Sequence, residues 1–320
     1  MRVGWSANNP GGMNALLPVI RALLERGDIV EGVATGPACD MAVAEGLAVS
    51  GGYTETPDVL LCGMSSGDSI DKELRGRYPD VPSVYILDFW SNYANCLTYK
   101  GKLFLPIIVC AIDELSMKEA IEDGIPAERI RVTGNPYFEH FADAITTEAE
   151  DPYMLLFLSQ PVKDDAGDAY GFDEHEALKA CISALQALPQ EYRLSIRLHP
   201  RDDVHKFDSL LGPRASLCEK LTLEEALSGA GLVVGMFSTT LLQAAAAGKR
   251  IVSYQPGMLE HDPLITNRLG ITRKVATEEE LAQAFIEYAD GMLPRVETPL
   301  KMFGPPGAVG RVIAILDELA

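Results

Sequence analysis

The feature that most constrains the fold of this chain is a regular alternation of apolar segments of strand length with segments of helical periodicity. In the first half, strands are predicted at residues 2–6, 29–34, 59–63, 84–87 and 107–111, and helices at residues 13–26, 68–77 and 113–123. A strand that is apolar throughout is buried on both faces, which requires helices on both sides of a parallel sheet. The alternation therefore predicts an α/β fold.

A second series of the same kind begins near Tyr153. Its strands are predicted at residues 154–158, 194–198, 232–235 and 251–254, and its clearest helices at residues 173–188, 239–247 and 278–291. A polar, acidic stretch at residues 146–152 separates the two series, and 320 residues suffice for two domains of ordinary size. We therefore predict two Rossmann-like domains facing a cleft, at residues 1–148 and 149–304.

The end of the chain forms a third part. The breaker cluster Gly304-Pro305-Pro306-Gly307 is followed by residues 308–319, which predict a short amphipathic helix. An isolated helix of this length is not stable in water, so its apolar face needs a covering surface. We expect residues 305–320 to cross back onto the first domain.

The composition excludes several classes of function. A formal net charge of −19 argues against nucleic acid or an anionic membrane as partner, since both require basic surface. The chain has neither an apolar run of about 18 residues nor a signal-peptide pattern, so we expect no membrane insertion. The six cysteines are scattered without a C-x-x-C pair, which fits a cytoplasmic protein, and no metal-ligand spacing is present. We expect no metal and no cofactor.

The strongest functional signal follows the predicted strand at residues 232–235. Ser238, Thr239 and Thr240 stand where an Ala-rich helix begins, and Gly248 stands where it ends. A helix N-terminus carries free N–H groups and partial positive charge, so hydroxyl groups placed there suit a phosphate or diphosphate. The alternative is an ordinary capped helix, because Ser and Thr are common N-caps.

A second candidate in the same half is His199. Ligands of open α/β sheets bind beyond the carboxyl ends of the strands, and His199 follows a predicted strand. Arg197 and Arg201 bring positive charge to the same strand end in an otherwise acidic chain. Both a phosphate-facing role and a structural role remain open. His140, His175, His205 and His261 have no comparable setting.

In the first half, glycines and carboxylates follow the predicted strands. Gly11 and Gly12 allow a close approach of the backbone to a ligand, although G-x-G-x-x-G is absent and a plain turn is the alternative. Asp68 reads either as the N-cap of the next helix or as a general base. Asp88 precedes two aromatic residues, so it could line a sugar pocket with Trp90, which could equally be a core residue.

These motifs together resemble a known superfamily. Two successive α/β halves, the hydroxyl-rich loop and the segment LLQAAAAGKRIVSY (residues 241–254) resemble GT-B glycosyltransferases. The layout is also similar to non-hydrolysing UDP-N-acetylglucosamine 2-epimerases and to glycerophosphate and capsule-sugar transferases. Pro57-Asp58 and the following strand, which leads to Asp68, resemble the P-D-x-x-x-x-x-G-D segment of the epimerases, and Leu198-His199-Pro200 resembles their H-x-N-P-type strand end.

The resemblance implies a GT-B-like enzyme whose second domain binds a nucleotide sugar. Ser238, Thr239 and Thr240 would hold the diphosphate, and His199 with Arg197 would help to neutralise it as it leaves. Gln243, which stands where GT-B enzymes often carry Glu, would contact the ribose.

The first domain would then hold an acceptor of unknown identity, with Gly11 and Gly12 at the ligand. Asp68 is the first choice for the base that an inverting enzyme needs, and Asp88 the second. We therefore expect a glycosyltransferase of cell-surface glycan or polysaccharide synthesis, compatible with a homodimer. The missing epimerase signature of paired Gly and paired Glu favours transfer. The alternatives are a nucleotide-sugar 2-epimerase or hydrolase, and a non-catalytic nucleotide-sugar-binding protein.

Overall fold

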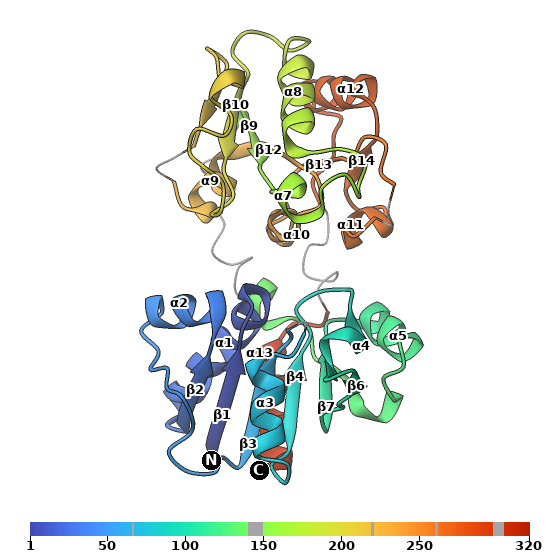
Figure 1. Ribbon diagram of the computed structural model, residues 1–320. Coiled ribbons are helices and arrows are strands. Elements are labelled where there is room, and N and C mark those ends of the chain that lie inside the picture. Colours follow the sequence, from blue (N-terminus) through green and yellow to red (C-terminus); the bar gives the residue numbers. More distant parts are fainter. Residues whose placement is uncertain (66, 140–149, 219–220, 260–261, 297–303) are drawn as a thin grey trace. The chain divides into compact units, whose positions relative to one another are not determined.

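The computed structural model describes residues 1–65, 67–139, 150–218, 221–259, 262–296 and 304–320 (Figure 1). The chain forms two compact units: unit 1 comprises residues 1–140 and 300–320, and unit 2 comprises residues 141–299. The boundary expected from the sequence, after residue 148, lies outside the described residues. Each unit is built on a parallel six-stranded sheet, which confirms the predicted α/β class and its two Rossmann-like domains.

Unit 1 has the strand order β2-β1-β3-β4-β7-β8. Every residue of β3 is buried, and because neighbouring side chains point to opposite faces, both faces of the sheet are covered. The strands are β1 (Arg2–Ala7), β2 (Ile29–Ala34), β3 (Val59–Gly63), β4 (Ser83–Ile86), β7 (Ile108–Ala111) and β8 (Ile130–Val132), with a separate hairpin of β5 (Thr98–Tyr99) and β6 (Lys102–Leu103). The helices are α1 (Pro10–Arg26), α2 (Gly36–Ala44), α3 (Ile70–Arg77), α4 (Tyr93–Cys96), α5 (Glu114–Glu122) and α13 (Ala308–Leu319).

The last helix, α13, packs in unit 1 although it follows unit 2 in the sequence (Figure 1). Val312 and Leu316 are fully buried in the same hydrophobic core as α1 and β1. The Glu139 carboxylate accepts hydrogen bonds from the Gly307 and Ala308 N–H groups at 2.6 and 2.9 Å, which satisfies the start of the helix. The sequence placed this helix on the first domain, and its start is held there by the Glu139 carboxylate.

The N-terminus of α1 lies against the loop that follows β3. A Cβ atom placed on Gly12 would lie 2.8 Å from the Met64 carbonyl oxygen and 3.1 Å from the Gly63 carbonyl carbon. Both are main-chain atoms, which cannot turn aside as a flexible side chain can. Glycine at this position lets the helix and the strand end meet.

We predict opposite effects for two helical glycines. Gly12→Ala should lower the stability of unit 1 by about 1–3 kcal/mol, because the added methyl overpacks a main-chain contact. Gly310→Ala is the matched control at an exposed position of α13, where an added Cβ meets nothing within 4 Å, and it should stabilise by roughly 0.5–1 kcal/mol. Urea unfolding of both variants measures this, and a Gly12→Ala protein as stable as wild type would refute the contact.

Unit 2 has the strand order β11-β10-β9-β12-β13-β14. All residues of β12 are buried, and the following helix α10 ends before Gly248, whose φ of 68° lies in the left-handed region, as expected. The strands are β9 (Asp151–Leu158), β10 (Arg193–Arg197), β11 (Ala215–Leu217), β12 (Ala230–Gly235), β13 (Ile251–Tyr254) and β14 (Arg273–Val275). The helices are α7 (Val162–Ala166), α8 (Glu174–Leu185), α9 (Leu223–Gly229), α10 (Thr239–Ala246), α11 (Ile265–Arg268) and α12 (Glu278–Ala289).

Within the described ranges, no helix combines the length and the apolar character that crossing a bilayer requires.

Candidate functional site

The strand orders locate one candidate half-site in each unit. In unit 1 the winding reverses between β1 and β3, and in unit 2 it reverses between β9 and β12. Ligands of such sheets bind at this reversal, beyond the carboxyl ends of the strands. The loops after β1, β3 and β4 therefore form the candidate half-site of unit 1, and those after β9, β10 and β12 form that of unit 2.

In unit 2, α10 begins without a side-chain cap. Ser238 occupies the N-cap position, but its hydroxyl bonds to the Thr240 hydroxyl and accepts no hydrogen bond from the helix N–H groups. Leu241 bonds back to the Ser238 carbonyl at 3.0 Å, whereas the N–H groups of Thr239 and Thr240 have no partner in the described part of the chain. The start of α10 therefore lacks the side-chain cap that an ordinary capped helix would have. The helix start keeps free donors and partial positive charge for an anion.

The turn that leads into α10 is held from two sides by side chains that the sequence did not single out. The Phe237 N–H donates to Gln160 Oε1 at 3.3 Å, which ties the turn to the end of β9. The Met236 carbonyl accepts a hydrogen bond from Ser253 Oγ, which lies in β13. It accepts another, at 3.1 Å, from Gln255 Nε2, which directly follows β13. The start of α10 is thus fixed before any ligand arrives.

His199 lies in the loop after β10 and is half-buried. Its Nδ1 accepts the Arg201 N–H at 3.2 Å, so the neutral ring carries its proton on Nε2. Burial lowers the pKa of His199, and the Arg201 charge acts in the same direction. The ring is therefore neutral near pH 7 and offers an Nε2–H donor.

A carboxylate that the sequence did not single out holds the His199 loop. Asp202 accepts from the His199 N–H at 2.9 Å, from Ser159 Oγ at 2.7 Å and from Lys206 Nζ at 2.7 Å. Ser159 and Gln160 are neighbours after β9, and they hold the His199 loop on one side of β9 and the start of α10 on the other. His199 and the hydroxyls of residues 238–240 thus follow the two strands that flank β9, at the same edge of the sheet.

The two arginines beside His199 make internal contacts. Arg197 Nη1 donates to the Leu221 carbonyl at 2.6 Å, and Arg201 Nη2 pairs with Asp165 at 2.6 Å. The geometry therefore favours the free N–H groups of α10 over these guanidinium groups as the positive element of the half-site. Gln243 is buried within α10, and its ribose contact stays a prediction.

In unit 1, the structure brings Gly11 and Asp88 together. A Cβ on Gly11 would lie 2.1 Å from Asp88 Oδ2, so only glycine leaves room for this carboxylate at the first turn of α1. Asp88 is half-buried and forms no ion pair within the described residues. Burial raises the pKa of Asp88 to about 6. A carboxylate with that pKa at a strand end is suited to general base catalysis near neutral pH.

Asp68 has a different setting. It is exposed, and its carboxylate accepts the Lys100 N–H at 2.7 Å, at the turn of the β5–β6 hairpin. The N-cap position of α3 is occupied by Ser69, so the interpretation of Asp68 as a cap is wrong. Trp90 is buried and donates from Nε1 to Asp113 at 2.9 Å, which makes it a core residue. The geometry favours Asp88 over Asp68 as a base.

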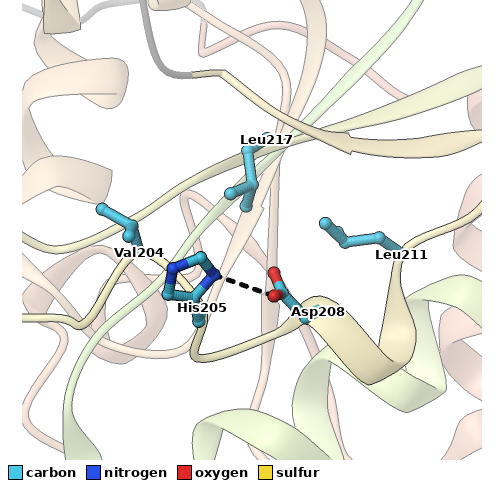
Figure 2. A pocket seen from close by; sticks show the side chains of 5 residues that line it. All are labelled: Val204, His205, Asp208, Leu211 and Leu217. Atoms are coloured by element: carbon cyan, nitrogen blue, oxygen red, sulfur yellow. Dashed lines mark hydrogen bonds and ion pairs between the residues drawn. The ribbon is translucent and has the colours of Figure 1, made fainter.

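A cavity of about 460 Å³ lies beside β11, one of the two edge strands of unit 2 (Figure 2). His205 Nδ1 lies 2.9 Å from Asp208 Oδ2, and both side chains are exposed. The lining residues are Val204, His205, Asp208, Leu211 and Leu217. Because β11 is two strands away from the reversal of the sheet, we do not assign the ligand to this cavity.

His140 and His261 lie outside the described residues. Within the described residues, no cluster of side chains that could hold a metal ion occurs.

Comparison with known proteins supports the fold. No protein-family model matches the chain, and no curated protein matches it by sequence. The solved structure of UDP-GlcNAc 2-epimerase from Neisseria meningitidis bound to UDP-GlcNAc is similar, with 14% identity, a TM-score of 0.68 and coverage of 99% of this chain and 100% of that one. The epimerase from Methanocaldococcus jannaschii in complex with UDP-GlcNAc and UDP has 15% identity, a TM-score of 0.66 and coverage of 99% and 100%.

A third similar structure is the glycotransferase of kitacinnamycin. It has 14% identity to this chain and a TM-score of 0.67, and the match covers 99% of this chain and 98% of that one. These matches span both units, so the similarity is not confined to one generic α/β domain. The chain therefore has the two-domain fold shared by these epimerases and this glycosyltransferase, which confirms at the level of fold the resemblance seen in the sequence.

Proposed function

We propose that this protein is an enzyme that binds a nucleoside diphosphate sugar in unit 2 and transfers the sugar to an acceptor held by unit 1. The observation that carries the proposal is the uncapped start of α10, which offers free N–H groups and three hydroxyls at the end of β12. His199 follows β10, on the other side of β9 at the same edge of the sheet. The similar epimerase structures contain UDP-GlcNAc or UDP, which supports the same class of ligand here.

In this proposal unit 2 stabilises the leaving nucleoside diphosphate. Ser238, Thr239 and Thr240 would donate to phosphate oxygens, and His199 Nε2–H would donate to one more. Negative charge grows on these oxygens as the bond from the sugar carbon to the phosphate oxygen breaks, so fixed donors lower the barrier. Gln243 keeps the ribose as its expected partner, and Arg197 is not needed.

Asp88 is the proposed base of unit 1. It would take the proton of the acceptor hydroxyl while that oxygen bonds to the anomeric carbon. A pKa of about 6 leaves the carboxylate mainly ionised at pH 7 yet more basic than an ordinary Asp. Gly11 leaves room for this carboxylate at the start of α1, and Gly12 lets the helix start meet the end of β3.

Epimerisation at the sugar is the second candidate function, favoured by the two epimerases among the similar structures. The same Asp88 would then remove a proton from a sugar carbon in place of an acceptor hydroxyl. An altered nucleotide sugar formed without any acceptor would select this function, whereas release of free nucleoside diphosphate that depends on the acceptor would select transfer. Binding without turnover across both panels would select a non-catalytic protein.

The first experiment is a thermal-shift screen with UDP, CDP, GDP, dTDP and CMP and the corresponding sugars. A ligand that binds only the native state stabilises it by RT ln(1 + L/Kd), where L is the free ligand concentration, so the melting temperature rises when that concentration exceeds the Kd. If nucleotides of one base raise the melting temperature, the sugar form of that nucleotide is the donor used in the turnover assays. No shift with any of them contradicts the nucleotide site.

Loss of the α10 hydroxyls should weaken nucleotide binding. We predict that Ser238→Ala with Thr239→Ala costs about 1.5–3 kcal/mol of binding free energy for each hydrogen bond lost to a charged phosphate. Calorimetry with the nucleotide found above measures the loss. Ser183→Ala, an exposed hydroxyl on α8 of the same unit, is the control and should bind as wild type does. Unchanged affinity in the double variant would leave residues 238–239 with a purely local role.

A further inference from the structure

A fully buried lysine lies beneath the loop after β3. Lys72 is 0% exposed, and its Nζ donates to the Ser65 carbonyl at 2.6 Å, to the Gly67 carbonyl, and to Ser69 Oγ at 3.3 Å. An ammonium has three N–H donors, so one loop of the chain uses all of them. The side chain thus joins α3 to the main chain at Ser65 and Gly67 and to the Ser69 hydroxyl.

The positive charge of Lys72 is balanced by nearby groups without a direct ion pair in the described part of the chain. Burial lowers the pKa of Lys72, while the nearby Asp71, Cys96 and Asp68 act in the opposite direction, yet within the described residues Lys72 forms no ion pair. Lys249 of unit 2, which is also fully buried, pairs directly with Glu150 at 3.1 Å. Burying a charge is costly unless its hydrogen bonds are satisfied, so the position of the carbonyls around Lys72 is closely constrained.

The same loop borders the half-site of unit 1. Its first residues, Gly63 and Met64, lie against the backbone of Gly12 at the start of α1, and Asp88 lies against the neighbouring Gly11. Burial raises the pKa of the Cys96 thiol to about 11; the Asp88 charge acts in the same direction and the Lys72 charge in the opposite one. The loop held by Lys72 is thus joined to the half-site through the main-chain contact of Gly63 and Met64 with Gly12.

We propose that Lys72 is a positioning residue for the acceptor half-site. Its ammonium holds the carbonyls of the loop in one arrangement, and this arrangement keeps the end of β3 against Gly12 and the start of α1 in place beside Asp88. Lys72 itself touches no reacting atom. Its effect on turnover rests on the proposed function, whereas its effect on the loop does not.

Removal of the ammonium tests this proposal. In Lys72→Ala, turnover should fall by up to about 10²-fold while nucleotide affinity in unit 2 is unchanged, because a displaced half-site misaligns the reactants. Propylammonium added to Lys72→Ala should restore part of the turnover, since it can occupy the space beside the two carbonyls. Lys72→Met fills that space with an apolar chain and should lose turnover without recovery. Lys118→Ala, an exposed lysine of α5 in the same unit, should behave as wild type.

Hydrogen exchange separates the positioning role from the proposed function. Peptides spanning residues 63–69 and 11–16 should exchange faster in Lys72→Ala and slow again with propylammonium, whether or not an activity has been found. If wild type turns over no nucleotide sugar, the proposed function fails and the exchange result alone decides the role of Lys72. Should Lys72→Ala not fold, the exchange of Lys72→Met is compared with that of wild type, and the same peptides should exchange faster, with no recovery on addition of the amine. Wild-type exchange in residues 63–69 of a folded variant, with no effect of the amine, overturns the proposal.

Discussion

Asp88→Asn should lower turnover by about 10²–10⁴-fold and leave nucleotide affinity unchanged. The amide has nearly the same shape as the carboxylate, so Gly11 can still lie against it, but it cannot accept a proton. Nucleotide affinity should be preserved because the proposed diphosphate contacts all belong to unit 2. Steady-state rates together with calorimetry on the same samples measure the two quantities separately.

The pH dependence gives a second readout of the same residue. A base acts when it is deprotonated, and the pKa of Asp88 is raised by burial from its ordinary value of 3.8 to about 6. Turnover of the wild type should therefore rise with pH through about 6. For stability the sign is opposite: the folded state favours the neutral form, so this carboxyl destabilises unit 1 progressively as pH rises from about 4 to about 6. Asp88→Asn should remove both effects and be slightly more stable than wild type at pH 7.

Asp68→Asn is the matched control for Asp88→Asn. Its carboxylate is exposed and accepts one main-chain hydrogen bond, from Lys100, so the variant should keep turnover within a few-fold and lose only a little stability in the hairpin. A large loss of turnover in Asp68→Asn with normal turnover in Asp88→Asn would reverse the assignment and restore the order expected from the sequence. Equal turnover in wild type and both variants would exclude either residue as the base.

Several strands could be predicted because they are mostly apolar. β3 is an unbroken apolar run and has the predicted bounds. β2 and β13 also have the predicted bounds, because Glu31 and Ser253 are single polar residues within otherwise apolar or glycine-containing segments. The outer strands β8, β11 and β14 were missed. Each has only three residues and is partly exposed, so none contains an apolar run long enough to distinguish it from a loop.

The site was predictable at the level of strand ends and not at the level of contacts. A strand followed by Asp, His or Ser marks a candidate, because parallel strands bring their carboxyl ends to one edge. Whether a side chain there is free depends on partners remote in sequence, such as Lys100 for Asp68 and Leu221 for Arg197. The spacing along one chain does not encode such pairs, so the order of Asp68 and Asp88 could not be determined from it.

The anchoring side chains had no sequence signal at all. Gln160 and Gln255 are ordinary polar residues after strands, and Lys72 lies in a short polar helix that reads as solvent-exposed. Their roles come from burial, which depends on how neighbouring elements pack. The one exception is Asp202, which stands three residues after His199. An acidic residue at that spacing after a strand often accepts main-chain hydrogen bonds in a turn, so this signal could have been used.

The second large effect concerns α13. Deleting residues 307–320 should abolish cooperative unfolding of unit 1. Val312 and Leu316 are completely buried in the core that α1 and β1 share, and each such side chain contributes about 1.5–3 kcal/mol by its burial. Their loss, about 3–6 kcal/mol before any cavity cost, approaches the whole stability of a typical domain, about 5–15 kcal/mol. The deletion also exposes the apolar face of α1 and removes Arg311, which donates to the Thr133 carbonyl at 2.7 Å.

Hydrogen exchange of α1 and β1 in the truncated protein measures this effect, with α12 of unit 2 as the internal reference. Exchange should become fast in unit 1 and stay slow in α12, because α13 belongs to unit 1 and α12 to unit 2. Two point variants calibrate the result. Leu316→Ala should cost about 2–5 kcal/mol, whereas Asp317→Ala, which removes only the exposed pair with Arg26, should cost less than about 1 kcal/mol. Slow exchange of α1 in the truncated protein would mean that α13 only packs on the surface of unit 1 and that its core is stable without this helix.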